Sequence, residues 1–148
     1  MKSWIIIGCS FCFLCGCYGF KTKLIPIRFE NNSSLETLLT IDTYVNGRNV
    51  KSTTVKRDSL KIYDASAIVD VDPDQELEFR FIMQSTHDTA SCKVSSQQIK
   101  KLGYIHVNFV KMIFEKGFVV FGRTLDKDSV AHHEFYCEAI DKGGVRIE

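Results

Sequence analysis

The feature that most constrains the fold is a series of short segments in which apolar and polar residues alternate. The clearest segment covers residues 77–83, where Glu78 and Arg80 separate apolar neighbours. Successive side chains of a β-strand point to opposite faces, so this spacing predicts a strand with one buried face and one solvated face. The residues predicted to be buried are Leu77, Phe79, Phe81 and Met83.

Further runs rich in Val, Ile, Thr, Phe and Tyr, separated by polar turns, predict more strands. We expect them over residues 25–29, 38–45, 48–55, 59–63, 67–71, 104–110, 118–124, 135–139 and 145–147, with a short one near Cys92. Pro26 predicts an edge position for the first strand, because proline cannot donate to a ladder. Residues 118–124 begin with an apolar run, which predicts a central strand.

Two local signals connect these strands. Asn46-Gly47 supplies the two positive φ angles of a type I′ turn and predicts a hairpin of residues 38–45 and 48–55. Residues 95–98 resemble a capping box, and Gly103 suits a helix C-cap, so residues 96–102 are predicted to form a short helix.

Together these elements predict one all-β domain over residues 24–148. About eight closely spaced strands and one short helix favour an antiparallel β-sandwich, immunoglobulin-like or transthyretin-like, although a small barrel fits the same pattern. The chain has 148 residues, of which 45% are hydrophobic and 25% charged. This composition excludes a disordered chain and a polytopic membrane protein.

The N-terminal residues differ from the rest of the chain. Lys2 is followed by an uncharged run from Ser3 to Phe20, whose apolar centre is as long as a signal-peptide core. A membrane-spanning helix needs about 20 apolar residues, which is more than this centre provides. The segment is therefore predicted to be a targeting signal.

Its end, Leu14-Cys15-Gly16-Cys17, resembles the lipobox of bacterial lipoproteins. The resemblance implies a signal peptide over residues 1–16, a lipidated Cys17 and a short tether to residue 23. It also implies a protein held in the cell envelope by fatty acyl chains such as palmitate. Tyr18 stands where an Asp would mark inner-membrane retention, which favours the outer membrane.

Two other interpretations of this segment stay open. A conventional signal peptide cut near Gly16 or Gly19 would give a secreted protein, in which Asn31 and Asn32 begin overlapping N-glycosylation sequons. The third interpretation is an N-terminal anchor that is not cleaved.

Six cysteines suggest a disulfide framework at first sight, but the signal changes that interpretation. Cleavage would remove Cys9, Cys12 and Cys15, and Cys17 would carry lipid. Cys92 and Cys137 then remain, and an oxidising compartment favours a disulfide between them. The alternative is a pair of buried free thiols.

One stripe of polar and aromatic residues is a possible binding face. Tyr104, His106 and Asn108 share a face of the strand over residues 104–110, opposite its apolar residues. An ordinary exposed sheet surface would have the same pattern.

No pattern in the sequence predicts catalysis, a metal or a cofactor. The chain contains no Gly-x-Ser-x-Gly elbow, and no thiol beside a His is apparent. Residues 70–74 place carboxylates at alternate positions, but Gln75 stands where a calcium loop needs Gly. His132 and His133 are adjacent, so on a strand they face opposite sides and do not readily share one ion.

These observations favour a non-enzymatic function. A net charge of +1 and the lack of an aromatic stacking platform exclude a general nucleic-acid binder. We expect a binding or assembly module with a membrane lipid and an envelope protein as partners. An inhibitor or immunity-type lipoprotein that blocks a hydrolase with the segments 84–91 or 126–133 is the alternative. A hydrolase whose site the sequence does not connect is the third hypothesis.

Overall fold

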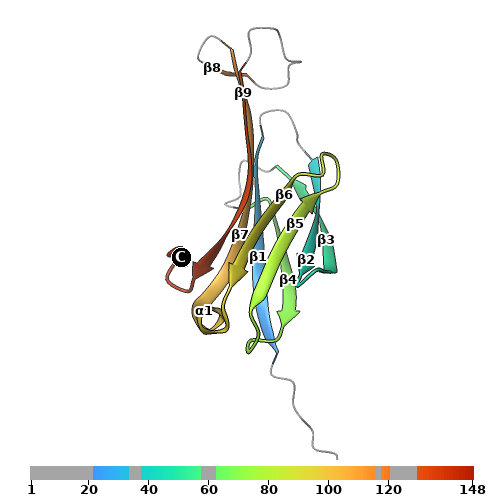
Figure 1. The fold of residues 1–148 in the computed structure, drawn as a ribbon. Coiled ribbons are helices and arrows are strands. Elements are labelled where there is room, and N and C mark those ends of the chain that lie inside the picture. Colours follow the sequence, from blue (N-terminus) through green and yellow to red (C-terminus); the bar gives the residue numbers. More distant parts are fainter. Residues whose placement is uncertain (1–21, 34–37, 58–62, 116–117, 121–129) are drawn as a thin grey trace, which may run out of the picture.

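The protein is a sandwich of two β-sheets (Figure 1). The computed structural model describes residues 22–33, 38–57, 63–115, 118–120 and 130–148. Within them the chain forms β1 (Lys23–Ser33), β2 (Leu38–Val45), β3 (Arg48–Lys56), β4 (Ala65–Val71), β5 (Leu77–Met83), β6 (Thr89–Val94), α1 (Ser96–Lys101), β7 (Leu102–Glu115), β8 (Phe118–Val120) and β9 (Val130–Asp141). The predicted all-β sandwich with one short helix is confirmed.

The sheets have different topologies. The four-stranded sheet has the order β3-β2-β5-β6 and is antiparallel throughout. The five-stranded sheet has the order β4-β1-β7-β8, and β9 also pairs with β7. Within the described residues no helix is long and apolar enough to cross a membrane.

The core lies between the two sheets and is built from alternate strand residues. Four phenylalanines are almost completely buried there: Phe29, Phe79, Phe81 and Phe109. The rings of Phe29 on β1 and Phe81 on β5 meet edge to face, with centroids 6.1 Å apart. The prediction that Leu77, Phe79, Phe81 and Met83 face inward is confirmed, since all four are buried.

The β2–β3 hairpin turns as predicted. Asn46 has a φ of 49° and Gly47 a φ of 79°, the two left-handed conformations of a type I′ turn. The Asn46 side chain also accepts a hydrogen bond from the Glu78 backbone N–H, at 2.8 Å, which ties the turn to β5.

The predicted edge position of the first strand is wrong. β1 lies between β4, with which it is antiparallel, and β7, with which it is parallel. Its pairing with β7 starts at Ile27, so Pro26 lies before the parallel ladder. The missing N–H of Pro26 therefore costs this ladder no hydrogen bond. Every other strand pair among the described residues is antiparallel.

The predicted central strand over 118–124 is wrong as well. β8 covers Phe118–Val120 and pairs with β7 at the end of the sheet order. In Figure 1 it lies beyond the end of the sandwich, where β7 and β9 continue past the other strands. Residues 121–124 and 59–62 of the predicted strands lie outside the described residues. At the C-terminus, the predicted strand 145–147 is reduced to a single bridge between Ile140 and Arg146.

The helix begins as predicted but ends differently. Ser95 Oγ accepts a hydrogen bond from the Gln98 backbone N–H at 3.3 Å, and Gln98 Oε1 accepts one from the Ser95 N–H at 2.8 Å. Leu102, in extended backbone, is the C-cap. Gly103 is therefore not a helix cap. It lies where the β7–β9 register shifts, and a Cβ built there would be 2.6 Å from the Asp141 carbonyl oxygen.

This close approach makes Gly103 a sensitive position. We expect Gly103→Ala to lower the free energy of unfolding by about 2 kcal/mol, because the β7 and β9 backbones must separate. Equilibrium urea denaturation measures the change. Gly143→Ala is the control, since its Cβ would meet only the Asp141 side chain, at 3.3 Å, and should cost less than about 1 kcal/mol. Equal effects of the two substitutions would contradict the role of the backbone contact.

Candidate functional site

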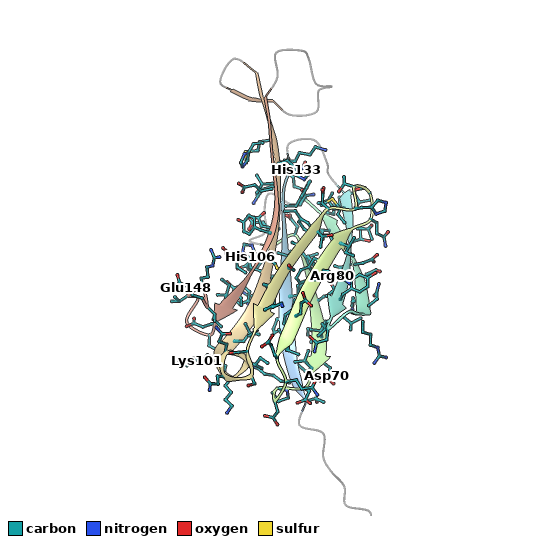
Figure 2. The ribbon with its side chains drawn as sticks, in the orientation of Figure 1. Asp70, Arg80, Lys101, His106, His133 and Glu148 are labelled. Atoms are coloured by element: carbon teal, nitrogen blue, oxygen red, sulfur yellow. The ribbon has the colours of Figure 1, made fainter. Side chains whose placement is uncertain are left out.

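The predicted stripe lies on the outer face of the five-stranded sheet, away from the core. Tyr104, His106 and Asn108 alternate along β7 with the buried residues Ile105, Val107 and Phe109. Figure 2 marks the place of His106 on the sandwich. Tyr104 and His106 are half-buried, and Asn108 is only 6% exposed. Such burial on an outer face means that neighbouring side chains cover Asn108.

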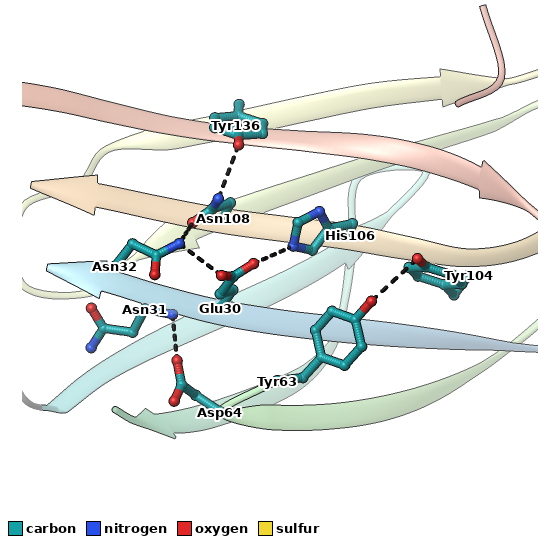
Figure 3. A network of polar contacts seen from close by, with 9 residues as sticks. All are labelled: Glu30, Asn31, Asn32, Tyr63, Asp64, Tyr104, His106, Asn108 and Tyr136. Carbon is teal, nitrogen blue, oxygen red and sulfur yellow. Dashed lines mark hydrogen bonds and ion pairs between the residues drawn. The ribbon is translucent and has the colours of Figure 1, made fainter. Parts of the chain in front are cut away.

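These neighbours form a continuous polar network across three strands (Figure 3). Asn32 Nδ2 on β1 donates to Glu30 Oε1 at 2.9 Å and to Asn108 Oδ1 at 3.1 Å. Glu30 Oε2 lies 3.0 Å from His106 Nε2. Asn108 Nδ2 donates to the Tyr136 hydroxyl on β9 at 2.9 Å. We call these five residues the outer-face network.

An aromatic cluster lies next to the outer-face network. The hydroxyls of Tyr63 and Tyr104 are 3.2 Å apart, and the Tyr63 ring meets the His106 ring edge to face at 5.8 Å. The Arg28 guanidinium lies over both tyrosine rings, 4.0 Å from the Tyr104 centroid and 4.9 Å from the Tyr63 centroid. A cation held between two aromatic faces is fixed in place.

The hydrogen bond between Tyr63 and Tyr104 shifts the pKa values of the two phenols. The contact with Tyr104 lowers the pKa of Tyr63, and the same contact raises the pKa of Tyr104. The directions are opposite because the bond favours the charged form of one phenol and the neutral form of the other. The nearby Arg28 charge lowers the pKa of both phenols.

Backbone contacts hold the Tyr63 segment against β1. The Asn31 N–H donates to Asp64 Oδ2 at 2.6 Å, and the Asp64 N–H donates to the Phe29 carbonyl at 2.9 Å. Tyr63 therefore approaches the network from a separate part of the chain. The arrangement as a whole is a preorganised surface that offers aromatic edges, a cation and amide groups side by side.

The sequence reasoning found three members of this surface and missed the others: Arg28, Glu30, Asn32, Tyr63 and Tyr136. Residues 28, 30 and 32 alternate with buried residues of β1, so an alternation analysis extended to Ser33 would have placed them on one face. No local signal could place Tyr63 or Tyr136, since their positions depend on which strands pair.

The two cysteines lie next to each other. Cys92 on β6 and Cys137 on β9 are both half-buried free thiols in the structure. A hydrogen bond with Cys92 raises the pKa of Cys137 far above its usual range, and burial adds to the shift. The predicted disulfide is thus not formed in the structure, although its partners are adjacent, and it stays a prediction.

The other residues considered as metal ligands in the sequence have structural partners close by. His132 pairs with Glu134 at 3.3 Å, whereas His133 pairs with Asp88 at 3.2 Å, so the two imidazoles have different partners. Within the described residues no three His, Cys, Asp or Glu side chains gather as metal ligands do. Asp72 accepts from the Asp74 N–H at 2.9 Å and serves the β4–β5 turn.

The predicted protruding segment 84–91 is a tight turn instead. β6 begins at Thr89, and the Met83 N–H donates to the Asp88 carbonyl at 3.0 Å, which closes the β5–β6 hairpin. Of the other segment, residues 130–133 belong to β9 and residues 126–129 lie outside the described residues. Cys17 also lies outside them.

No family model, no curated protein and no solved structure matches the chain.

Proposed function

We propose that this protein is a lipid-anchored component of the bacterial cell envelope whose β-sandwich is a non-enzymatic binding or assembly module. Its binding face is the outer face of the five-stranded sheet. The observation that carries this proposal is the outer-face network together with the Arg28–Tyr63–Tyr104 cluster.

A surface of this kind suits recognition for two reasons. Tyr and Arg are among the residues most enriched at the energetic centres of protein interfaces. Arg28 is already held against the rings of Tyr63 and Tyr104, and Asn108 already donates to the Tyr136 hydroxyl. Binding therefore costs little additional side-chain entropy. The Glu30 carboxylate engages Asn32 with one oxygen and His106 with the other, which favours a structural role over proton transfer.

The anchor part of the proposal rests on the resemblance of Leu14-Cys15-Gly16-Cys17 to a lipobox. Acyl chains on Cys17 would hold the protein by burying methylene groups, at about 0.8 kcal/mol each. A tether over residues 18–23 spans at most about 20 Å when extended. In Figure 2 the chain enters the sandwich at the end marked by Lys101 and Asp70, which would then face the membrane.

Labelling with a fatty-acid analogue tests the anchor. We expect the wild-type protein to incorporate the analogue and Cys17→Ser to lose all labelling, because the acyl acceptor is gone. Cys15→Ser, two residues away, should keep its label. Persistent labelling of Cys17→Ser, or a native protein found soluble in the medium, would contradict lipidation.

Affinity capture from envelope extract tests the binding face. We expect Tyr104→Ala to weaken capture of the partner about tenfold or more, since truncation of a central interface tyrosine removes a large contact. Tyr44→Ala is a matched control: Tyr44 lies on the other sheet, and the Arg80 guanidinium is 5.3 Å from its ring centroid. Equal capture by the two variants would argue against this binding face.

One observation favours a second candidate, an inhibitor or immunity-type lipoprotein. The β1–β7 register ends at Lys111, whereas the β7–β9 ladder continues to the pair of Phe114 and Val130. The resulting arm projects past the sandwich (Figure 1), as a segment that enters a hydrolase cleft must do. Replacing the arm by a short turn would abolish inhibition of such a hydrolase, while Tyr104→Ala would leave it intact.

A further inference from the structure

An open depression follows one edge of the five-stranded sheet. Its volume is about 470 Å³, and its lining consists of Arg146 and five consecutive residues of β9, Glu134–Glu138. Successive side chains of a strand alternate between faces, so a hollow lined by five in a row runs along the strand's edge. Within the described residues, β7 is the only strand that pairs with β9. The opposite edge of β9 is the one that borders the depression.

The hydrogen bonds of the C-terminal segment show which backbone groups this edge presents. The Asp141 N–H donates to the Val145 carbonyl, and the Ile147 N–H donates to the Ala139 carbonyl, both at 2.8 Å. In an antiparallel ladder, the residues that face one neighbour alternate with those that face the other. The N–H and C=O groups of Cys137 and Phe135 therefore point to the same side as those of Ala139, along the depression.

The C-terminal segment also shows what kind of strand this edge accepts. Ile147 packs against the core, whereas the Arg146 guanidinium turns outward and lies 2.9 Å from the Glu138 carboxylate. Val145, Arg146 and Ile147 thus alternate apolar and basic residues against the end of β9. Farther along the edge the outward acid is Glu134, with a side chain that is 53% exposed, and the inward residues are Phe135 and Cys137.

We propose that the free edge of β9 binds an extended segment of a partner protein, in which basic and apolar residues alternate, as an added antiparallel strand. Its backbone continues the pairing that the single Ile140–Arg146 bridge begins, and its basic side chains meet Glu134 and join Arg146 at Glu138. The apolar side chains pack beside Phe135 and Cys137. This inference rests on the proposed binding function and names the chemistry of its partner.

Charge disfavours a second copy of this chain as the occupant. If the β9 strands of two copies paired antiparallel, with the two Tyr136 residues opposite each other, Glu134 of each copy would lie opposite Glu138 of the other. Like charges directly opposite each other destabilise a strand pair. A basic partner strand instead adds cations at Glu134, next to His132, and at Glu138, next to Arg146.

Fluorescence anisotropy with a labelled octapeptide of alternating lysine and valine tests the proposal on the full-length protein in a neutral detergent. We expect saturable binding that weakens as salt is added. A glutamate–valine peptide should bind at least tenfold more weakly. Glu134→Gln combined with Glu138→Gln should weaken lysine–valine binding by about tenfold. Glu78→Gln, an exposed acid on β5, should have no effect.

The backbone contribution has its own test. In the proposed register the valine amides face β9, because residues of a hydrogen-bonded pair place their side chains on the same face. N-methylation of the valine residues should weaken binding at least tenfold, and N-methylation of the lysine residues should not.

Three results would overturn strand addition at β9. The first is a lack of binding at millimolar peptide, and the second is equal affinity for the lysine–valine and glutamate–valine peptides. The third is an affinity that valine N-methylation does not change. A dimer in sedimentation that Glu134→Gln strengthens would also overturn it, by assigning the edge to a second copy. If the peptide tests fail while Tyr104→Ala still loses the envelope partner, the binding face stands and only the strand addition is wrong.

Discussion

Phe81→Ala will lower the free energy of unfolding by about 3–5 kcal/mol, the range found when large core side chains are truncated. Phe81 is completely buried on β5, and its ring meets Phe29 of the opposite sheet. The substitution removes apolar contacts from both sheets and leaves a cavity that a stiff sandwich refills only in part. Equilibrium urea denaturation at constant pH measures the loss.

Ile82→Ala is the matched control for this prediction. Ile82 is the next residue of the same strand, but it lies on the outer face and is half-buried. We expect a loss of about 1 kcal/mol or less there, because water already reaches the side chain. A larger loss for Ile82→Ala than for Phe81→Ala would mean that the two faces of β5 are assigned the wrong way round.

The same contrast explains how much of the fold the sequence could predict. Phe81 was predicted to be buried because alternation is a property of consecutive residues, and the hairpin at Asn46-Gly47 was predicted because its φ angles are local. The place of β1 was not predictable in this way. Proline has no N–H to donate to a second neighbouring strand, yet the chain avoids this conflict: Pro26 pairs with β4, and the parallel pairing with β7 starts one residue later, at Ile27.

Gly103 illustrates a related limit. A glycine after a helical segment favours a C-cap, and only the approach of the Asp141 backbone, 38 positions along the chain, gives this glycine its actual role. A helix C-cap and a close approach of two backbones both favour a residue without a Cβ atom, so glycine suits either one. Local pattern alone does not distinguish them.

Only part of the candidate site could be predicted, because alternation along one strand is local whereas the pairing of distant strands is not. Tyr104, His106 and Asn108 share a face of one strand, so their grouping follows from alternation. Their partners come from β1, β9 and the segment before β4, and these meet only through the registers of Glu30 with Asn108 and Asn108 with Tyr136. Register between distant strands depends on the whole core, which the sequence near Tyr104 does not encode.

Oxidation of Cys92 and Cys137 to a disulfide will raise the free energy of unfolding by up to about 4 kcal/mol, because the bond closes a loop of about 46 residues in the unfolded chain. β6 is the last strand of its sheet order, β9 pairs with β7 of the other sheet, and β6 and β9 contact each other. A bond between them would therefore join the two sheets along one side of the sandwich. Unfolding followed with and without reductant measures the effect, and Cys92→Ser, which cannot form the bond, should be insensitive to reductant.

The state of the same two thiols also tests the export signal. A disulfide oxidoreductase of an oxidising compartment would take two electrons and two protons from the pair, whereas a reducing cytosol would keep both thiols free. Alkylation of denatured, unreduced protein purified from cells, followed by peptide mass spectrometry, should leave Cys92 and Cys137 unmodified. If both residues are alkylated, the disulfide prediction is wrong and the domain has not met the oxidising environment that a lipobox at Cys17 implies. The fold alone would accommodate either result, because Cys92 and Cys137 are free thiols that lie close enough for Cys92 to raise the pKa of Cys137.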